Sequence, residues 1–183
     1  MLEQKIIEHC APTLAGIKSA NLINYHFESK EVVLQELVIL NQKLNRRGVY
    51  VEALLWKEDS ALVYLYRRSY LEKELKQDGV KELLSQYGYK DMEVESCLFH
   101  LRKRLFQYDC FPHEIGVFLG YPLQDVIGFI ENGGQNCKCC GLWKVYCNEC
   151  ETRLLFDKLR KCTAVYIKAF AEGRSIAQMT ICA

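Results

Sequence analysis

The sequence predicts an α+β fold, in which one helix-rich domain forms around a small sheet. Two observations lead to this prediction. Hydrophobic residues recur at steps of three and four over much of the chain, as in helices that bury one face. The period changes between residues 49 and 66, where two runs rich in β-branched and aromatic residues flank a polar stretch at 57–60. We therefore expect an antiparallel hairpin at about 49–66.

Amphipathic patterns predict helices on both sides of this hairpin. The pattern at 31–47 ends at Gly48, and glycine commonly follows the last turn of a helix. Proline is tolerated at the first helical position, so further helices can begin at Pro112 and Pro122. Residues 14–27 fit a helix or a strand, and residues 142–146 are a candidate strand. The remaining helical patterns span 69–77, 79–87, 93–107 and 151–172.

Length, charge and hydropathy narrow the class of protein. A chain of 183 residues fits one globular domain over 1–183. With 24 Lys+Arg against 23 Asp+Glu, no strong field favours nucleic acid or acidic lipid as a partner. No apolar run approaches about 18 residues, and the first residues lack the basic and apolar regions of a signal peptide. We expect a cytoplasmic protein with no membrane span.

The cysteine content is the unusual feature of the composition. The chain has ten cysteines, too few for a disulfide-stapled secreted scaffold, so we expect reduced thiols. Four dispersed cysteines have apolar neighbours and are expected to be small buried hydrophobic residues: Cys97, Cys110, Cys162 and Cys182. Five others fall within residues 137–150: Cys137, Cys139, Cys140, Cys147 and Cys150.

The cluster contains two C-x-x-C pairs, Cys137/Cys140 and Cys147/Cys150. Four thiolates could hold zinc, or iron alone or in an iron–sulfur cluster, and zinc or iron is therefore the cofactor that this pattern predicts. The spacing argues against a shared site. If residues 142–146 form a straight strand, Cys140 and Cys147 lie about 23 Å apart, too far to bind one metal ion.

A second interpretation of the cluster is thiol redox chemistry. Cys147 and Cys150 precede the helix expected at 151–172, and a helix N-terminus lowers the pKa of a nearby thiol. A redox or metal-handling protein would then be the partner. The clustered cysteines could also be incidental, and the protein would in that case be a metal-free interaction module.

A third interpretation is a cysteine-dependent enzyme. Cys10, before a turn-like Ala-Pro-Thr sequence, could act as nucleophile, with His113 as base and Glu114 as the residue that orients it. The alternative is that His113 and Glu114 only stabilise the start of a helix after Pro112.

Several longer stretches of the sequence resemble a known family. They span residues 9–18, 111–122, 125–126, 128–130, 140–146 and 161–162. In these phrases the chain resembles the bacterial domain-of-unknown-function family 3793, found largely in anaerobic Gram-positive bacteria. The resemblance covers nearly the whole chain. Its motifs include Cys10, His113, Glu114, Cys140 and Cys162, but not Cys147 or Cys150.

The resemblance implies a second choice of metal ligands. These would be Cys10, Cys140 and Cys162, with His113 as a further candidate. The leading expectation is a cytoplasmic protein whose cysteines bind a metal ion or serve a thiol-redox role.

Overall fold

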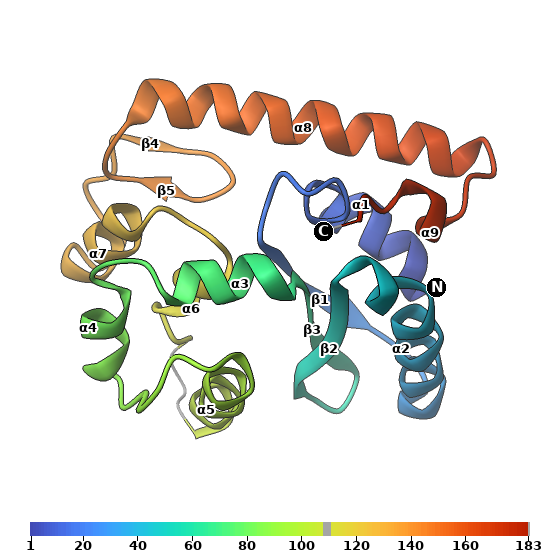
Figure 1. Ribbon diagram of the computed structural model, residues 1–183, viewed down its shortest axis with the longest axis horizontal. Helices are drawn as coiled ribbons and strands as arrows, with labels where there is room; N and C mark the ends of the chain where they lie inside the picture. Colours follow the sequence, from blue (N-terminus) through green and yellow to red (C-terminus); the bar gives the residue numbers. More distant parts are fainter. Residues whose placement is uncertain (108–110, 183) are drawn as a thin grey trace. The chain divides into compact units, whose positions relative to one another are not determined.

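The computed structural model describes residues 1–107 and 111–182, and its fold is α+β, as the sequence predicts (Figure 1). The chain forms two compact units. Unit 1 comprises residues 1–71 and 162–183, and unit 2 comprises residues 72–161. No helix within the described ranges combines the length and apolar character needed to cross a membrane.

Unit 1 is built on a three-stranded antiparallel sheet with strand order β1-β3-β2. The hairpin predicted at about 49–66 is confirmed as β2 (Val49–Trp56) and β3 (Ser60–Arg67). Strand β1 (Ala20–His26) lies in the segment whose pattern fitted a helix or a strand. It is a strand because it pairs with β3 along its whole length, from Ala20 opposite Tyr66 to His26 opposite Ser60.

Helices contribute the rest of the core of unit 1. Helix α1 (Leu2–Leu14), α2 (Lys30–Leu44) and α9 (Ile176–Met179) share one hydrophobic cluster with the sheet (Figure 1). The Ser29 hydroxyl caps α2 by accepting a hydrogen bond from the Val32 N–H. A 3-10 turn, η1 (Asn45–Arg47), follows α2. Gly48, at φ +74°, then turns the chain into β2.

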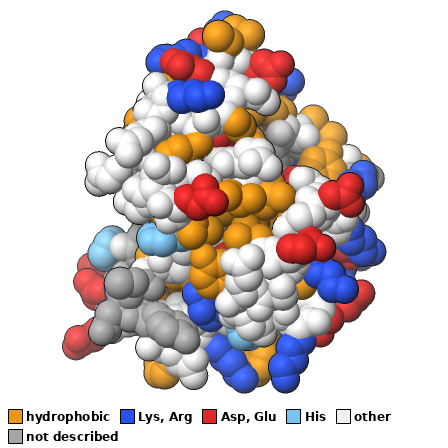
Figure 2. Space-filling view, turned by 90° about the vertical axis from the view of Figure 1, so that its left-hand side faces the viewer, with side chains coloured by type: hydrophobic (Ala, Val, Ile, Leu, Met, Phe, Trp, Pro, Cys, Tyr) orange, Lys and Arg blue, Asp and Glu red, His pale blue; other side chains and the backbone are white. Residues whose placement is uncertain are grey.

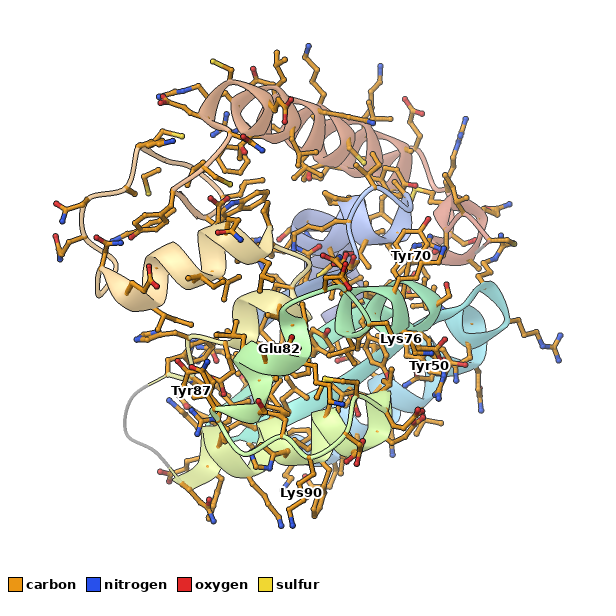
Figure 3. The ribbon with its side chains drawn as sticks, turned by 60° about the vertical axis from the view of Figure 1, so that its left-hand side comes forward. Tyr50, Tyr70, Lys76, Glu82, Tyr87 and Lys90 are labelled. Atoms are coloured by element: carbon orange, nitrogen blue, oxygen red, sulfur yellow. The ribbon has the colours of Figure 1, made fainter. Side chains whose placement is uncertain are left out.

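A fully buried arginine ties the end of α1 to the C-terminal segment. Arg67 Nε donates to the Thr13 carbonyl, and Arg67 Nη2 donates to the carbonyls of Leu14 and Ile181, at 2.6–2.8 Å. Tyr70, labelled in Figure 3, lies beside this guanidinium and donates its hydroxyl to the Gly16 carbonyl. These donors satisfy carbonyls that a helix C-terminus leaves without an intrahelical partner.

The described part of unit 2 consists of helices and one small hairpin. It begins within α3 (Arg68–Leu75) and ends within α8 (Glu149–Ala171). Strands β4 (Cys139–Cys140) and β5 (Lys144–Val145) form the hairpin, which lies beside α7 (Figure 1). The other helices of the unit are α4 (Val80–Ser85), α5 (Val94–Gln107), α6 (Ile115–Phe118) and α7 (Leu123–Glu131).

A buried ion pair joins α5 to the start of α6. The side chain of Glu114 is 1% exposed and binds the Arg104 guanidinium through both carboxylate oxygens. Tyr89 donates its hydroxyl to the same carboxylate at 3.3 Å. The Arg104 guanidinium also lies 5.0 Å from the ring centroid of Tyr87, which Figure 3 labels. This network fixes the loop that leads into α6.

Candidate functional site

Unit 2 contains a pocket of about 330 Å³ between α6, α7 and the β4–β5 hairpin. This volume lies at the lower end of the range typical of small-molecule sites. Figure 2 views this side of the unit and shows hydrophobic side chains gathered at the centre of the face, with charged side chains around them. Four aromatic residues line the pocket: Phe111, Tyr121, Phe129 and Trp143.

The aromatic walls are held by ring contacts. The rings of Tyr121 and Trp143 stack with centroids 4.7 Å apart, and Phe156 of α8 meets the Trp143 ring edge-on at 4.5 Å. On the other wall, the His113 imidazole contacts the Phe129 ring at 5.0 Å. Such contacts restrict the motion of each ring, so the pocket is largely preformed.

One buried carboxylate, Asp125 in the first turn of α7, holds the hairpin against this helix. Asp125 Oδ2 accepts a hydrogen bond from the Trp143 indole at 2.9 Å. Asp125 Oδ1 accepts the backbone N–H groups of Tyr146 and Cys147 and the Cys147 thiol, at 2.7–3.2 Å. Burial raises the pKa of Asp125, but these donors outweigh burial and hold the pKa below its ordinary value. Asp125 is therefore a carboxylate at neutral pH.

Two glycines permit the close packing around the hairpin. A Cβ atom at Gly128 would lie 2.5 Å from Tyr146 Cγ, and one at Gly141 would lie 2.2 Å from Phe156 Cε2. Both distances are far below van der Waals contact. The absent side chains therefore let the hairpin lie directly on α7 and α8.

The hairpin confirms one part of the strand expected at 142–146 and corrects another. Lys144 and Val145 form β5, whereas residues 141–143 form a tight turn that joins β4 to β5, and the Gly141 N–H donates to the Trp143 carbonyl. Glycine at position 141 and the buried anchor at Asp125 explain the turn, because both favour close packing over extension. The separation of about 23 Å calculated for a straight strand therefore does not apply.

The register of the hairpin places Cys140 and Lys144 together at the pocket. They are direct cross-strand partners, so their side chains project from the same face with Cβ atoms about 5 Å apart. Both line the pocket, and Cys140 is exposed. The Lys144 ammonium donates to the Gly134 carbonyl at 2.6 Å and lies 5.8 Å from the Phe129 ring centroid.

The three residues of the expected enzyme site have different environments. Cys10 lies inside α1 rather than in a turn, with Pro12 in the last helical turn, and it is fully buried in the core of unit 1. Burial raises the pKa of its thiol to about 12, so the thiol is protonated at neutral pH. In unit 2, His113 is exposed at the pocket, whereas Glu114 is turned into its ion pair with Arg104.

The clustered cysteines face different directions. Neighbouring residues of a strand point to opposite sides. Cys139, paired with Val145, is buried, whereas Cys140 points toward the pocket. Cys137 is half-buried, Cys150 is exposed, and Cys147 is half-buried with its thiol on Asp125. Burial and the Asp125 carboxylate raise the pKa of Cys147 to about 11, the opposite direction from that expected at a helix start.

No group of three or more His, Cys, Asp or Glu side chains is arranged to hold a metal ion within residues 1–107 and 111–182. Both sets of proposed ligands, Cys137/Cys140/Cys147/Cys150 and Cys10/Cys140/Cys162, stay predictions.

The dispersed cysteines only partly follow the expectation of burial. Cys97 is buried and its thiol donates to the Asp91 carbonyl, whereas Cys162 is half-buried and Cys182 is exposed. Cys110 lies outside the described residues.

Several residues of the pocket carried no site prediction from the sequence. Tyr121, Phe129, Lys144 and Asp125 lie only within the longer stretches that carry the family resemblance. The sequence did contain a usable signal, because an aromatic residue closely follows each of three glycines. Tyr121 follows Gly120, Phe129 follows Gly128, and Trp143 lies two residues after Gly141. That pattern is typical of close packing around a pocket.

The comparisons with known proteins name a family but no activity. A family model described as a protein of unknown function, DUF3793, matches residues 6–180, nearly the whole chain. No curated protein and no solved structure matches the chain. The family match confirms the resemblance seen in the sequence, and the chain therefore belongs to the DUF3793 family.

Proposed function

We propose that unit 2 binds a small, flat, largely apolar electrophile in its aromatic pocket and that the thiol of Cys140 attacks it. A sulfur–carbon bond forms, the bond from that carbon to its leaving group breaks, and the thiol proton passes to solvent. One observation carries this proposal. Of the cysteines that the structure describes, Cys140 is the one that lines the pocket. A thiol positioned beside a bound molecule gains from proximity, because the pocket holds the two reacting groups together.

The environment of Cys140 supports its role over that of Cys10. Cys10 is sealed in a core, and its protonated thiol is a poor nucleophile. Cys140 is exposed and has His113 and Lys144 in the lining of the same pocket. The proposal therefore moves the thiol chemistry from Cys10 to Cys140 and keeps His113 as the residue able to exchange a proton.

The position of the pocket in the sequence also supports this function. Every residue that lines the pocket falls within 111–130 or 140–144, stretches that carry most of the family resemblance. We also propose that the protein works in the cytoplasm, where a thiol such as Cys140 stays reduced and reactive.

The test compares two alkylating reagents on the native protein. Monobromobimane carries a flat aromatic-like ring system, whereas iodoacetamide does not. In both reactions a sulfur–carbon bond forms, halide leaves, and the thiol proton passes to solvent. Cys150 is the internal control, because it is exposed but does not line the pocket. Peptide mass spectrometry gives the labelling rate of each cysteine.

We expect the ratio of bimane to iodoacetamide labelling to be about tenfold higher at Cys140 than at Cys150, the effect of about 1.4 kcal/mol of binding in the pocket. Equal ratios at the two cysteines would contradict the proposal. Metal analysis on the same anaerobic sample tests the earlier prediction. Near-stoichiometric zinc or iron that blocks labelling of Cys140 would favour metal binding instead.

A further inference from the structure

We infer that the molecule bound in the pocket of unit 2 is an aromatic anion, with its ring among the aromatic walls and its negative group on the Lys144 ammonium. The inference rests on the proposed function, because it names the class of molecule that this pocket accepts.

The Lys144 ammonium is the cationic donor in the described lining of the pocket. An ammonium has three N–H groups. Lys144 uses one of them on the Gly134 carbonyl, and its position 5.8 Å from the Phe129 centroid places the charge beside an aromatic wall. The His113 imidazole, exposed at the same wall, adds a ring nitrogen that can donate.

The acidic side chain in the described lining of the pocket directs its oxygens at the protein and not at a ligand. Asp125 accepts two backbone N–H groups, the Trp143 indole and the Cys147 thiol, so both of its oxygens are occupied by donors of the protein. A ligand donor would therefore have to compete with these protein donors for the Asp125 oxygens. Among the lining residues that the structure describes, Lys144 is therefore the charged group left to attract a ligand, and it favours an anion.

The walls and the volume define the rest of the ligand. Stacked and edge-on rings at Tyr121, Trp143 and Phe129 favour a flat aromatic partner. A pocket of about 330 Å³ leaves room for one or two fused rings with a small substituent. A carboxylate and a sulfonate both meet the requirement for the substituent, because each presents acceptor oxygens to an ammonium.

The test uses two fluorescent probes that differ in charge. Anilinonaphthalene sulfonate has an aromatic ring system with one sulfonate, and phenylnaphthylamine has the same ring system without it. A Trp56→Phe background leaves Trp143, at the pocket, as the one remaining tryptophan of the two in the sequence. Energy transfer from Trp143 then reports probe bound near this site.

The variant is Lys144→Met, which keeps an unbranched side chain only one atom shorter and removes its charge. Lys138→Met is the matched control, because Lys138 is exposed next to the same hairpin but does not line the pocket. We expect Lys144→Met to weaken binding of the sulfonate about tenfold. Binding of phenylnaphthylamine should change less than about twofold, and Lys138→Met should alter neither affinity appreciably.

The outcomes separate this inference from the proposed function. If both probes bind but Lys144→Met leaves the sulfonate affinity unchanged, the anion selection is wrong and the pocket stands. If Lys144→Met weakens both probes equally, Lys144 only supports the wall, and the inference is again overturned. If neither probe binds near Trp143, the proposed ligand pocket itself fails.

Discussion

Cys10 and Cys140 carry the same side chain in opposite surroundings. Cys10 lies in unit 1 within a continuous core of sheet and helices, and burial raises the pKa of its thiol to about 12. Cys140 lies in unit 2 at the edge of an open aromatic pocket, opposite Lys144. The contrast teaches that the number of cysteines in a chain says little about reactivity, because the environment of each thiol decides it.

The two units differ in how they are stabilised as well. Both units bury hydrophobic side chains, and unit 1 adds the hydrogen bonds of three paired strands. Unit 2 has only a hairpin of two-residue strands within its described residues, and two buried carboxylates, Glu114 and Asp125, tie its separate segments together. Substitutions at these carboxylates and at the two thiols test this comparison.

The largest expected effect is that of Glu114→Ala. It leaves the Arg104 guanidinium, 16% exposed, without its buried partner, and breaking such a pair costs about 3–5 kcal/mol. Urea unfolding followed by Trp143 fluorescence in the Trp56→Phe background measures this loss in unit 2. Glu149→Ala breaks the exposed pair with Arg153 and is the control, because water screens that pair and little change is expected. Equal losses of stability in the two variants would show that the Glu114–Arg104 pair is not a buried, stabilising ion pair.

Asp125→Asn comes next. The amide keeps one acceptor but turns an N–H₂ group toward donors, so we expect a loss of about 1.5–3 kcal/mol, the range for hydrogen bonds to a charged group. The same fluorescence measurement applies.

The pH dependence of this effect has a defined sign. The folded pKa of Asp125 lies below its ordinary value of 3.8, so the carboxylate stabilises the folded state fully above about pH 4. That contribution is lost as the pH falls through the folded pKa. Asp125→Asn should therefore flatten the acid part of the stability curve, and an unchanged acid limb would show that Asp125 is not the anchor.

The smallest effects come from the thiols themselves. Cys10→Ser places a hydroxyl in an apolar core and should cost about 1–3 kcal/mol. Cys140→Ser, at an exposed position, should cost less than about 0.5 kcal/mol.

The Cys10 effect also depends on pH. Because the pKa of Cys10 is raised from 9.0 to about 12, the contribution of its protonated thiol to folding stability is fully present below about pH 9 and is lost as the pH rises toward 12. Circular dichroism during urea unfolding at neutral and alkaline pH measures both variants.

Local patterns predicted much of the fold. The change of period at residue 49 predicted the β2–β3 hairpin, and the helical patterns at 31–47 and 93–107 correspond to α2 and α5. Strand β1 could not be assigned because its partner, β3, lies about forty residues away and local composition does not include it. Pro12 was read as part of a turn, yet α1 accommodates it in the last turn.

The site was less predictable than the fold. His113 and Cys140 stood out by residue type and by the family resemblance, and both line the pocket. Asp125 did not, because its partners at Trp143, Tyr146 and Cys147 are some twenty residues away in the sequence. The burial of Cys10 could not be predicted for the same reason, since burial is a property of the packed core and not of spacing.

The most direct test of the contrast between the thiols is native-state labelling of Cys10 and Cys140 at neutral pH over a series of sub-denaturing urea concentrations. We predict that Cys140 reacts without urea at a rate that urea hardly changes, because it is already exposed. Cys10 should react only through opening of the core of unit 1, so its labelling rate should rise steeply with urea. The opening free energy calculated from that rate, extrapolated to zero urea, should equal the free energy of global unfolding. Labelling of Cys10 as fast as Cys140 in the absence of urea would contradict the account.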